Sequence, residues 1–102
     1  MTPTEPGPNP APRPSQYRVI AAARARRDLQ RLPEAVAAAV YEFVDTALAG
    51  NPHRVGKPLL APFQGLHSAR RGSYRIVYRI DDDTSTVQIA WIDHRADVYR
   101  PH

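Results

Sequence analysis

The stretch Gly72-Ser73-Tyr74-Arg75-Ile76-Val77-Tyr78-Arg79-Ile80 decides the fold of this 102-residue chain. Apolar and aromatic side chains alternate in it with arginines, and a period of two residues indicates a β-strand with one buried face. The pattern places Arg75, Val77 and Arg79 on one face and Tyr74, Ile76, Tyr78 and Ile80 on the other. A strand with arginines at outward positions presents cations on a rigid support.

Upstream of this strand the hydrophobic pattern changes to helical spacing. Residues 17–21 are expected to form a short strand, and residues 22–32 a helix with its apolar side chains on one face. Pro33 ends that helix and begins a second one, which we expect to run to about Ala49, where Gly50 and Pro52 follow as stop signals. Two helices connected so closely must fold back on each other as a hairpin.

Three further strands are expected at 66–70, 73–81 and 86–92, after a loop-rich segment that covers residues 51–65. Tight antiparallel turns join them. The order β-α-α-β-β-β predicts an α+β domain in which the helical hairpin packs on one face of a mainly antiparallel four-stranded sheet. We expect the opposite face to stay open and to carry Arg75 and Arg79.

Composition sets limits on the rest of the chain. Residues 1–16 contain six prolines and, apart from Met1, no large apolar residue, so they are expected to form a disordered tail before a single domain at 17–102. No apolar run resembles a secretory signal or a membrane span, and we expect a cytoplasmic protein. The chain has no cysteine, which excludes disulfides and thiolate metal sites. Its net charge of +4, carried almost entirely by arginine, favours RNA, DNA or an acidic protein as partner.

Groups that bind phosphate or move protons gather near the C-terminus. Arg75 is a candidate for phosphate binding, whereas Arg79 has an ion pair with the aspartate-rich turn as its alternative. His94 is able to act as acid or base near neutral pH, and Tyr99 can do so only if cations lower its pKa. For His94 and Tyr99 a purely structural role remains an equal alternative. Cations combined with proton-transfer groups are typical of a metal-free ribonuclease.

Other motifs are absent or ambiguous. Lys57, Arg70 and Arg71 add basic positions, for which charge alone favours a solvated basic loop over a binding surface. The four histidines lack a metal-ligand spacing such as HExxH, and the chain has no glycine-rich phosphate loop. The sequence therefore predicts neither a metal nor a cofactor.

Four segments, taken together, resemble the RelE/ParE superfamily of bacterial toxins, and specifically its RelE-like branch. They cover about residues 17–100 in the family's order and lie at 25–33, 56–59, 68–80 and 93–100. The R-x-G-x-Y-R-[IVL]-[VL]-Y block combined with the terminal H-R-x-x-V-Y block is the most specific part of the resemblance.

The resemblance implies a RelE-like fold and a toxin of a type II toxin–antitoxin system. Such a toxin is an endoribonuclease, an mRNA interferase that enters the ribosome, cuts mRNA without a metal and inhibits translation. The 2′-OH of the RNA attacks the adjacent phosphate, which makes the enzyme specific for RNA. A cognate antitoxin blocks the toxin, and the complex of the two binds operator DNA.

The resemblance also implies roles for individual residues. Arg75 and Arg95 match arginines that stabilise charge on the phosphate, while His94 and Tyr99 match residues that take part in proton transfer. Further contacts to RNA are expected from the remaining basic positions, namely Lys57, Arg70, Arg71 and Arg79.

One departure and two alternatives accompany this interpretation. Leu66 and Ser68 stand where well-known members of the branch carry lysines that help to activate the nucleophile, which shifts the acid–base work onto His94. The alternatives are a ParE-like inhibitor of DNA gyrase and a non-catalytic member that binds antitoxin and DNA. The clustered His94, Arg95 and Tyr99 favour the nuclease.

Overall fold

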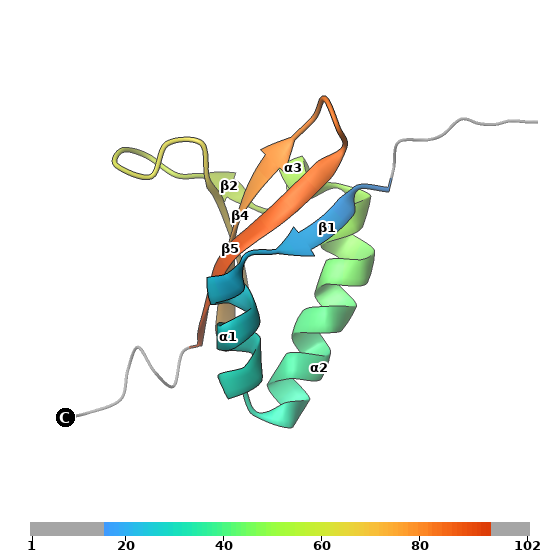
Figure 1. Cartoon of the computed structure of the whole chain (residues 1–102), viewed down its shortest axis with the longest axis vertical. Coiled ribbons are helices and arrows are strands. Elements are labelled where there is room, and N and C mark those ends of the chain that lie inside the picture. The colour runs from blue at the N-terminus through green and yellow to red at the C-terminus, as the bar shows by residue number, and fades with distance from the viewer. Residues whose placement is uncertain (1–15, 95–102) are drawn as a thin grey trace, which may run out of the picture.

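The computed structural model describes residues 16–94 and confirms the α+β fold, with two helices packed on a mixed sheet (Figure 1). The sheet has the strand order β1-β5-β4-β3-β2, in which β1 runs parallel to β5 and the other neighbours are antiparallel. The elements in chain order are β1 (Arg18–Ala21), α1 (Ala23–Arg31), α2 (Glu34–Phe43), the π-helical turn η1 (Val44–Leu48), α3 (Pro52–Val55), β2 (Lys57–Pro58), β3 (His67–Arg71), β4 (Tyr74–Asp81) and β5 (Thr86–His94).

The structure differs from the four-stranded prediction in the segment that was expected to be only loop. Asn51 caps a short helix, because its side-chain oxygen accepts a hydrogen bond from Arg54 N and Pro52 fits the first helical turn. Two residues after that helix, β2 pairs with β3 and becomes a fifth strand. The Asn-Pro dipeptide was a visible signal for the helix, whereas a two-residue strand has no periodicity to read.

Strand β4 lies at the centre of the sheet, and its alternating pattern correctly identified its buried face. Tyr74, Ile76 and Tyr78 are buried, and the Tyr74 hydroxyl donates a hydrogen bond to the main-chain carbonyl of Ala39 on α2 at 3.3 Å. Phe43 packs edge-to-face on Tyr74. Helix α2 therefore covers this side of the sheet, which we call the inner face.

A β-bulge interrupts the pairing of β4 with β5. Val77 lies opposite Trp91, while the next residue, Tyr78, lies opposite Ile89, so Ala90 has no partner on β4. An extra residue reverses the faces of everything that follows it in the strand. After the bulge Ile92 points to the inner face, and Trp91 and Asp93 point away from α2.

The face of the sheet away from α2 is the outer face, and a loop covers part of it. The loop runs from Leu59 to Leu66 and is closed by a backbone hydrogen bond of 2.9 Å between these two residues. It places the Phe63 ring 5.9 Å from the Trp91 ring, and Figure 1 shows the loop, in yellow, on the side of the sheet opposite α2. The expectation of a fully open face was therefore wrong, and Val77 is only 2% exposed. The residues that register and alternation place on the outer face include Lys57, Ser68, Arg70, Arg75, Val77, Arg79, Gln88, Trp91 and Asp93.

Helix α1 completes the edge of β5 where β1 ends. The β1–β5 pairing stops at Ala21 and Ile89, after which Ala22 N donates to Ile89 O at 2.9 Å. One turn further along α1, the carboxylate of Asp28 accepts a hydrogen bond of 2.9 Å from Ile92 N. A side chain thus replaces the strand that β5 lacks at this point. In the described part of the chain, no helix is long and apolar enough to cross a membrane.

Two sets of predicted residues lie outside residues 16–94. These are the proline-rich tail, except for Gln16, and the C-terminal residues Arg95 and Tyr99. The predictions made for them stay predictions.

We predict that Asp28→Ala lowers the free energy of unfolding by about 1–3 kcal/mol, because it leaves the partly buried Ile92 N–H without an acceptor. Urea denaturation measures the change. Asp28→Asn keeps an acceptor oxygen and should cost less than the alanine variant.

The matched control is Asp45→Ala, which removes an exposed aspartate from η1. Its effect should stay within about 0.5 kcal/mol. If the Asp28 and Asp45 variants are equally stable, then the hydrogen bond to β5 is not important for the fold.

Candidate functional site

Two arginines face each other across the outer face. Arg70 on β3 and Arg75 on β4 are direct partners in the antiparallel register. Like charges at directly opposite positions repel, and a folded sheet without a ligand gains nothing from that arrangement. An anion placed between the two guanidinium groups would convert the repulsion into attraction. This pair is therefore the strongest candidate for an anion site on the described residues.

Asp93 balances only part of this charge. It lies opposite Arg75 on the other neighbouring strand, and its Oδ2 is 3.4 Å from Arg75 Nη2. The same oxygen accepts a hydrogen bond of 3.3 Å from the indole N–H of Trp91. A guanidinium group has five N–H donors, so most of those on Arg75 remain available, and its buried Nε has no partner among the described residues. Because the Arg75 side chain is 41% exposed, a phosphate group can reach it.

Two other predicted RNA-binding residues share the outer face. Lys57 lies opposite Ser68, and Arg79 lies opposite Gln88 at the end of β4 that is further from Arg75. Arg79 is exposed and forms no salt bridge with a residue in the described range. The alternative that Arg79 pairs with the aspartate-rich turn is therefore not what the structure shows.

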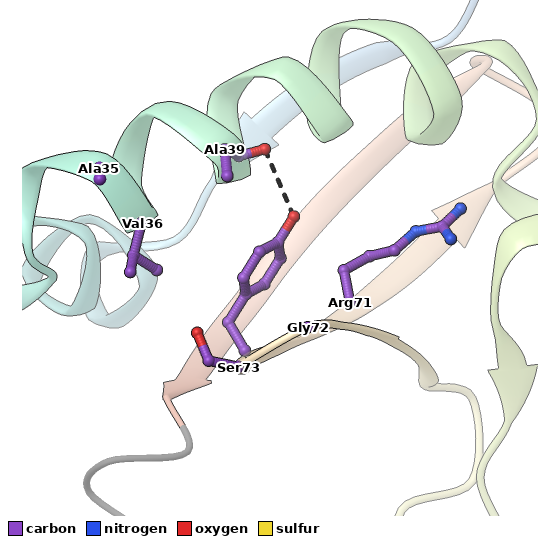
Figure 2. A pocket seen from close by; sticks show the side chains of 7 residues that line it. Ala35, Val36, Ala39, Arg71, Gly72 and Ser73 are labelled. Carbon is purple, nitrogen blue, oxygen red and sulfur yellow. Dashed lines mark hydrogen bonds between the residues drawn. The ribbon is translucent and has the colours of Figure 1, made fainter.

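The structure separates Arg71 from these cations. Alternation places Arg71 on the inner face, where its guanidinium carbon lies 4.8 Å from the centre of the Phe43 ring. Arg71 lines a pocket of about 370 Å³ between α2 and the turn that joins β3 to β4 (Figure 2). Gly72 begins that two-residue turn with a φ of +53°, a conformation that glycine adopts without strain.

The pocket contains no side chain suited to proton transfer at neutral pH. Figure 2 shows Ala35, Val36 and Ala39 along its helical wall and Arg71 and Ser73 on the sheet side. Its one phenol, Tyr74, also has its pKa raised by burial, so it stays protonated. We therefore place the candidate reaction site on the outer face and not in this pocket.

His94 ends β5 and does not share the face of Arg75. It lies opposite Tyr74, which points to the inner face, and its Nε2 is 3.2 Å from the Ser73 hydroxyl. Both residues nevertheless belong to one end of the sheet, where β4 begins and β5 finishes. The structure thus brings Arg70 and Arg75 together, and it places His94 at the same end of the sheet but on the other face. The predicted cluster with Arg95 and Tyr99 stays a prediction.

Sequence reasoning missed Trp91, Asp93 and Phe63. Asp93 stands beside His94 in the sequence, but its pairing with Arg75 depends on the register of two strands. A signal for Trp91 existed in the run Ile89-Ala90-Trp91-Ile92, because four consecutive apolar residues break the alternation of a half-buried strand. Nothing in the local sequence indicates that Phe63 crosses to β5.

A second cluster joins histidines that the sequence shows as scattered. His53 Nε2 lies 2.9 Å from Asp82 Oδ1, to which the Tyr17 hydroxyl also donates a hydrogen bond of 2.7 Å. The His53 ring stands edge-on to that of His67, which stacks on Tyr78. Hydrogen bonds from His53 and Tyr17 hold the pKa of Asp82 below its usual value. No group of three metal-binding side chains occurs within residues 16–94.

The cluster makes folding sensitive to pH. Burial lowers the pKa of His67, nearby His53 lowers it further, and Asp82 opposes the shift more weakly. Below the ordinary histidine pKa of about 6.5, the unfolded chain therefore binds a proton that the folded chain does not. Stability is fully present above that pH and falls as the pH drops, at a rate of at most about 1.4 kcal/mol per pH unit for this one group.

We predict that His67→Phe reduces the loss of stability between pH 7.5 and pH 5.5, because phenylalanine keeps the stacked ring and does not titrate. Urea denaturation of both proteins at the two pH values measures the difference. Asp82 ionises below this window, because hydrogen bonds from His53 and Tyr17 hold its pKa below the ordinary aspartate value. Equal pH dependence in the two proteins would show that His67 is not the titrating group.

Most of the chain is similar to proteins of a known toxin family. The family model described as "ParE toxin of type II toxin-antitoxin system, parDE" matches residues 19–99. The chain is 57% identical over 84 residues to a protein named Toxin RelE from Mycobacterium tuberculosis, a match that covers 82% of this chain and 87% of the relative. It is 54% identical to Toxin RelG from the same organism, with 82% and 97% covered.

A solved structure agrees with these relatives. The chain resembles a chain in the crystal structure of the toxin–antitoxin complex RelBE2 from Mycobacterium tuberculosis with a TM-score of 0.78 and 52% identity. That match covers 80% of this chain and 94% of the other.

Proposed function

We propose that this protein is a ribosome-dependent endoribonuclease, because the chain belongs to the RelE/ParE superfamily of toxins from type II toxin–antitoxin systems. In the proposed reaction, the 2′-oxygen of an mRNA nucleotide forms a bond to the adjacent phosphorus while the bond from phosphorus to the 5′-oxygen breaks. One proton leaves the 2′-OH and another reaches the departing 5′-oxygen. The products are a 2′,3′-cyclic phosphate and a free 5′-OH, and no metal-bound water is needed.

The Arg70–Arg75 pair is the observation that carries this proposal. Two arginines at directly opposite positions of neighbouring strands can bind one anion between them, and the phosphate in this reaction gains negative charge as the 2′-oxygen attacks. Donors fixed before the reaction stabilise such charge without reorganising. Arg75, which also matches the family's strand arginine, is the residue that we assign to the transition state.

His94 is our candidate for proton transfer, with Arg95 and Tyr99 following it in the chain. The reaction centre would then lie at the end of the sheet, with the phosphate on the outer face and His94 at the rim. Histidine exchanges protons near neutral pH, which suits both proton steps.

In this proposal Lys57 replaces one of the two lysines that are absent at positions 66 and 68. Ser68 occupies one of the two positions at which well-known members of the RelE-like branch carry lysine, and it lies on the outer face directly opposite Lys57. An ammonium group one strand away therefore reaches the same region of a bound RNA. The other position, Leu66, is buried and is not replaced in this way.

A cognate antitoxin is the partner that we propose for this toxin. The similar mycobacterial chain was solved in a toxin–antitoxin complex, and a net charge of +4 favours an acidic partner segment. We expect the two proteins together, and not the toxin alone, to bind operator DNA. Messenger RNA on the ribosome would be reached in the cytoplasm.

We predict that Arg75→Ala lowers the rate of mRNA cleavage by about 10²- to 10³-fold, the usual loss when one transition-state donor is removed. Primer extension on a defined mRNA in a translation extract measures it, with cuts expected only when ribosomes are present. Thermal unfolding should change little, because the ion pair of Arg75 is partly exposed.

Arg27→Ala is the matched control, since it removes one positive charge from an exposed position on α1 and should leave cleavage intact. Intact mRNA with the wild-type protein would overturn the nuclease. The next assay would then be DNA supercoiling by gyrase, because the matching family model is described as a ParE toxin.

A further inference from the structure

We propose that Phe63 and Trp91 bind a nucleobase of the RNA, next to the phosphate that Arg75 holds, and so contribute to the choice of cleavage site. The proposal rests on the proposed nuclease function and adds a base-recognition site to it.

The position of Phe63 is the first argument. The loop from Leu59 to Leu66 starts and ends at the far side of the sheet, yet it reaches across to β5, where the Phe63 and Trp91 rings meet at an angle of 63°. Phe63 is 47% exposed and does not belong to the hydrophobic core. The backbone hydrogen bond between Leu59 and Leu66 closes the loop and limits its movement. An exposed aromatic ring in a closed loop is suited to contact with a ligand.

Trp91 is fixed in orientation by polar groups. The guanidinium carbon of Arg24 lies 4.9 Å from the centre of its ring, and its indole N–H donates to Asp93. Trp91 is half-buried, and its polar edge is satisfied. Arg24 is exposed, so its planar guanidinium adds a third surface on which a base can stack.

Spacing connects this aromatic pair to the phosphate site. Trp91 and Asp93 are two residues apart on β5, about 7 Å along the strand, a separation that one nucleotide can span between its phosphate and its base. Asp93 Oδ2 contacts both Arg75 and Trp91, so one carboxylate fixes the position of the phosphate-binding arginine relative to the tryptophan ring.

The chemistry of the surface selects single-stranded RNA. The aromatic rings of Trp91 and Phe63 lie among the cations of the outer face, which are Lys57, Arg70, Arg75 and Arg79, and Arg24 of α1 lies over Trp91. Aromatic rings set within a positively charged face are the arrangement that binds unpaired bases together with their phosphates. A duplex keeps its bases stacked inside and could use only the cations.

Trp91 is the only tryptophan of the chain, so its fluorescence reports on this site alone. The probe is a 2′-O-methyl trinucleotide, which lacks the nucleophile and is not cut. We expect saturable quenching with this trinucleotide. An analogue with the same phosphates but abasic sugars should bind more weakly and without quenching. Equal binding of the two probes, or no binding of either, would overturn the base site.

The test variant is Phe63→Leu, which keeps an apolar side chain and removes the ring. Its affinity for the trinucleotide should fall by about 5- to 150-fold, the range measured for loss of one stacked base, while its affinity for the abasic probe stays the same. The matched control is Leu60→Ala, because Leu60 is 84% exposed in the same loop, and its affinity for both probes should not change. Equal affinity of the Phe63→Leu and wild-type proteins for the trinucleotide would show that the Phe63 ring does not bind a base.

Cleavage assays separate failure of this site from failure of the nuclease. With Phe63→Leu, primer extension should show cuts at a changed set of codons, whereas Arg75→Ala should show almost none. Unchanged cut positions with Phe63→Leu would overturn the base site and leave the nuclease standing. If the wild-type protein cuts nothing but still binds the trinucleotide better than the abasic probe, the nuclease fails and the base site stands.

Discussion

The outer face depends on one extra residue in β5. Without the bulge at Ala90, strict alternation would turn Ile92 out of the core and direct Trp91 and Asp93 toward α2. Burial of Ile92 opposite Ile76 fixes the register after the bulge, since a shift by one residue would expose that isoleucine. The same burial brings Asp93 beside Arg75, so that packing on the inner face determines the chemistry of the outer one.

The bulge has a second consequence at the edge of β5. The pairing with β1 ends at Ile89, just before the bulge, and the carboxylate of Asp28 instead accepts a hydrogen bond from the partly buried N–H of Ile92. The strand that carries Trp91 and Asp93 is therefore held on one side by β4 and on the other by α1. Residues intended to meet a ligand gain precision when the elements beneath them are rigid.

The sequence predicted those parts of the fold that depend on local hydrophobic patterns and helix-stop residues. The alternation in 72–80 located β4 and its buried face, and Pro33 with Gly50 bounded the helical hairpin correctly. Strand β2 was missed because two residues show no period. Helix α3 is also too short to show one, although Asn51 and Pro52 marked its start. The bulge was missed because the sequence shows a broken alternation without saying which residue is left unpaired.

The candidate site was predictable only in part, for a related reason. Arg75 was found from its place on an alternating strand and from the family resemblance. Its partners Arg70 and Asp93 depend on how three strands align, which single-strand patterns do not encode. Arg71 was grouped with Arg70 because the two are adjacent, although adjacent residues of a strand always point to opposite faces. Phe63 reaches Trp91 by the path of a loop, and loop paths follow from tertiary contacts.

The electrostatics of the outer face favour a ligand-binding role over a structural one. Arg70 and Arg75 repel each other across the two strands. The nearby carboxylate of Asp93 contacts Arg75 but also accepts a hydrogen bond from the indole N–H of Trp91, so it balances their charge only in part. A face selected for stability alone would place an acidic residue at position 70, where it would pair with Arg75 across the strands. Position 70 instead carries a second positive charge, which an anionic ligand would balance. A protein that binds gyrase needs no such anion site, and this is the physical reason for preferring the nuclease.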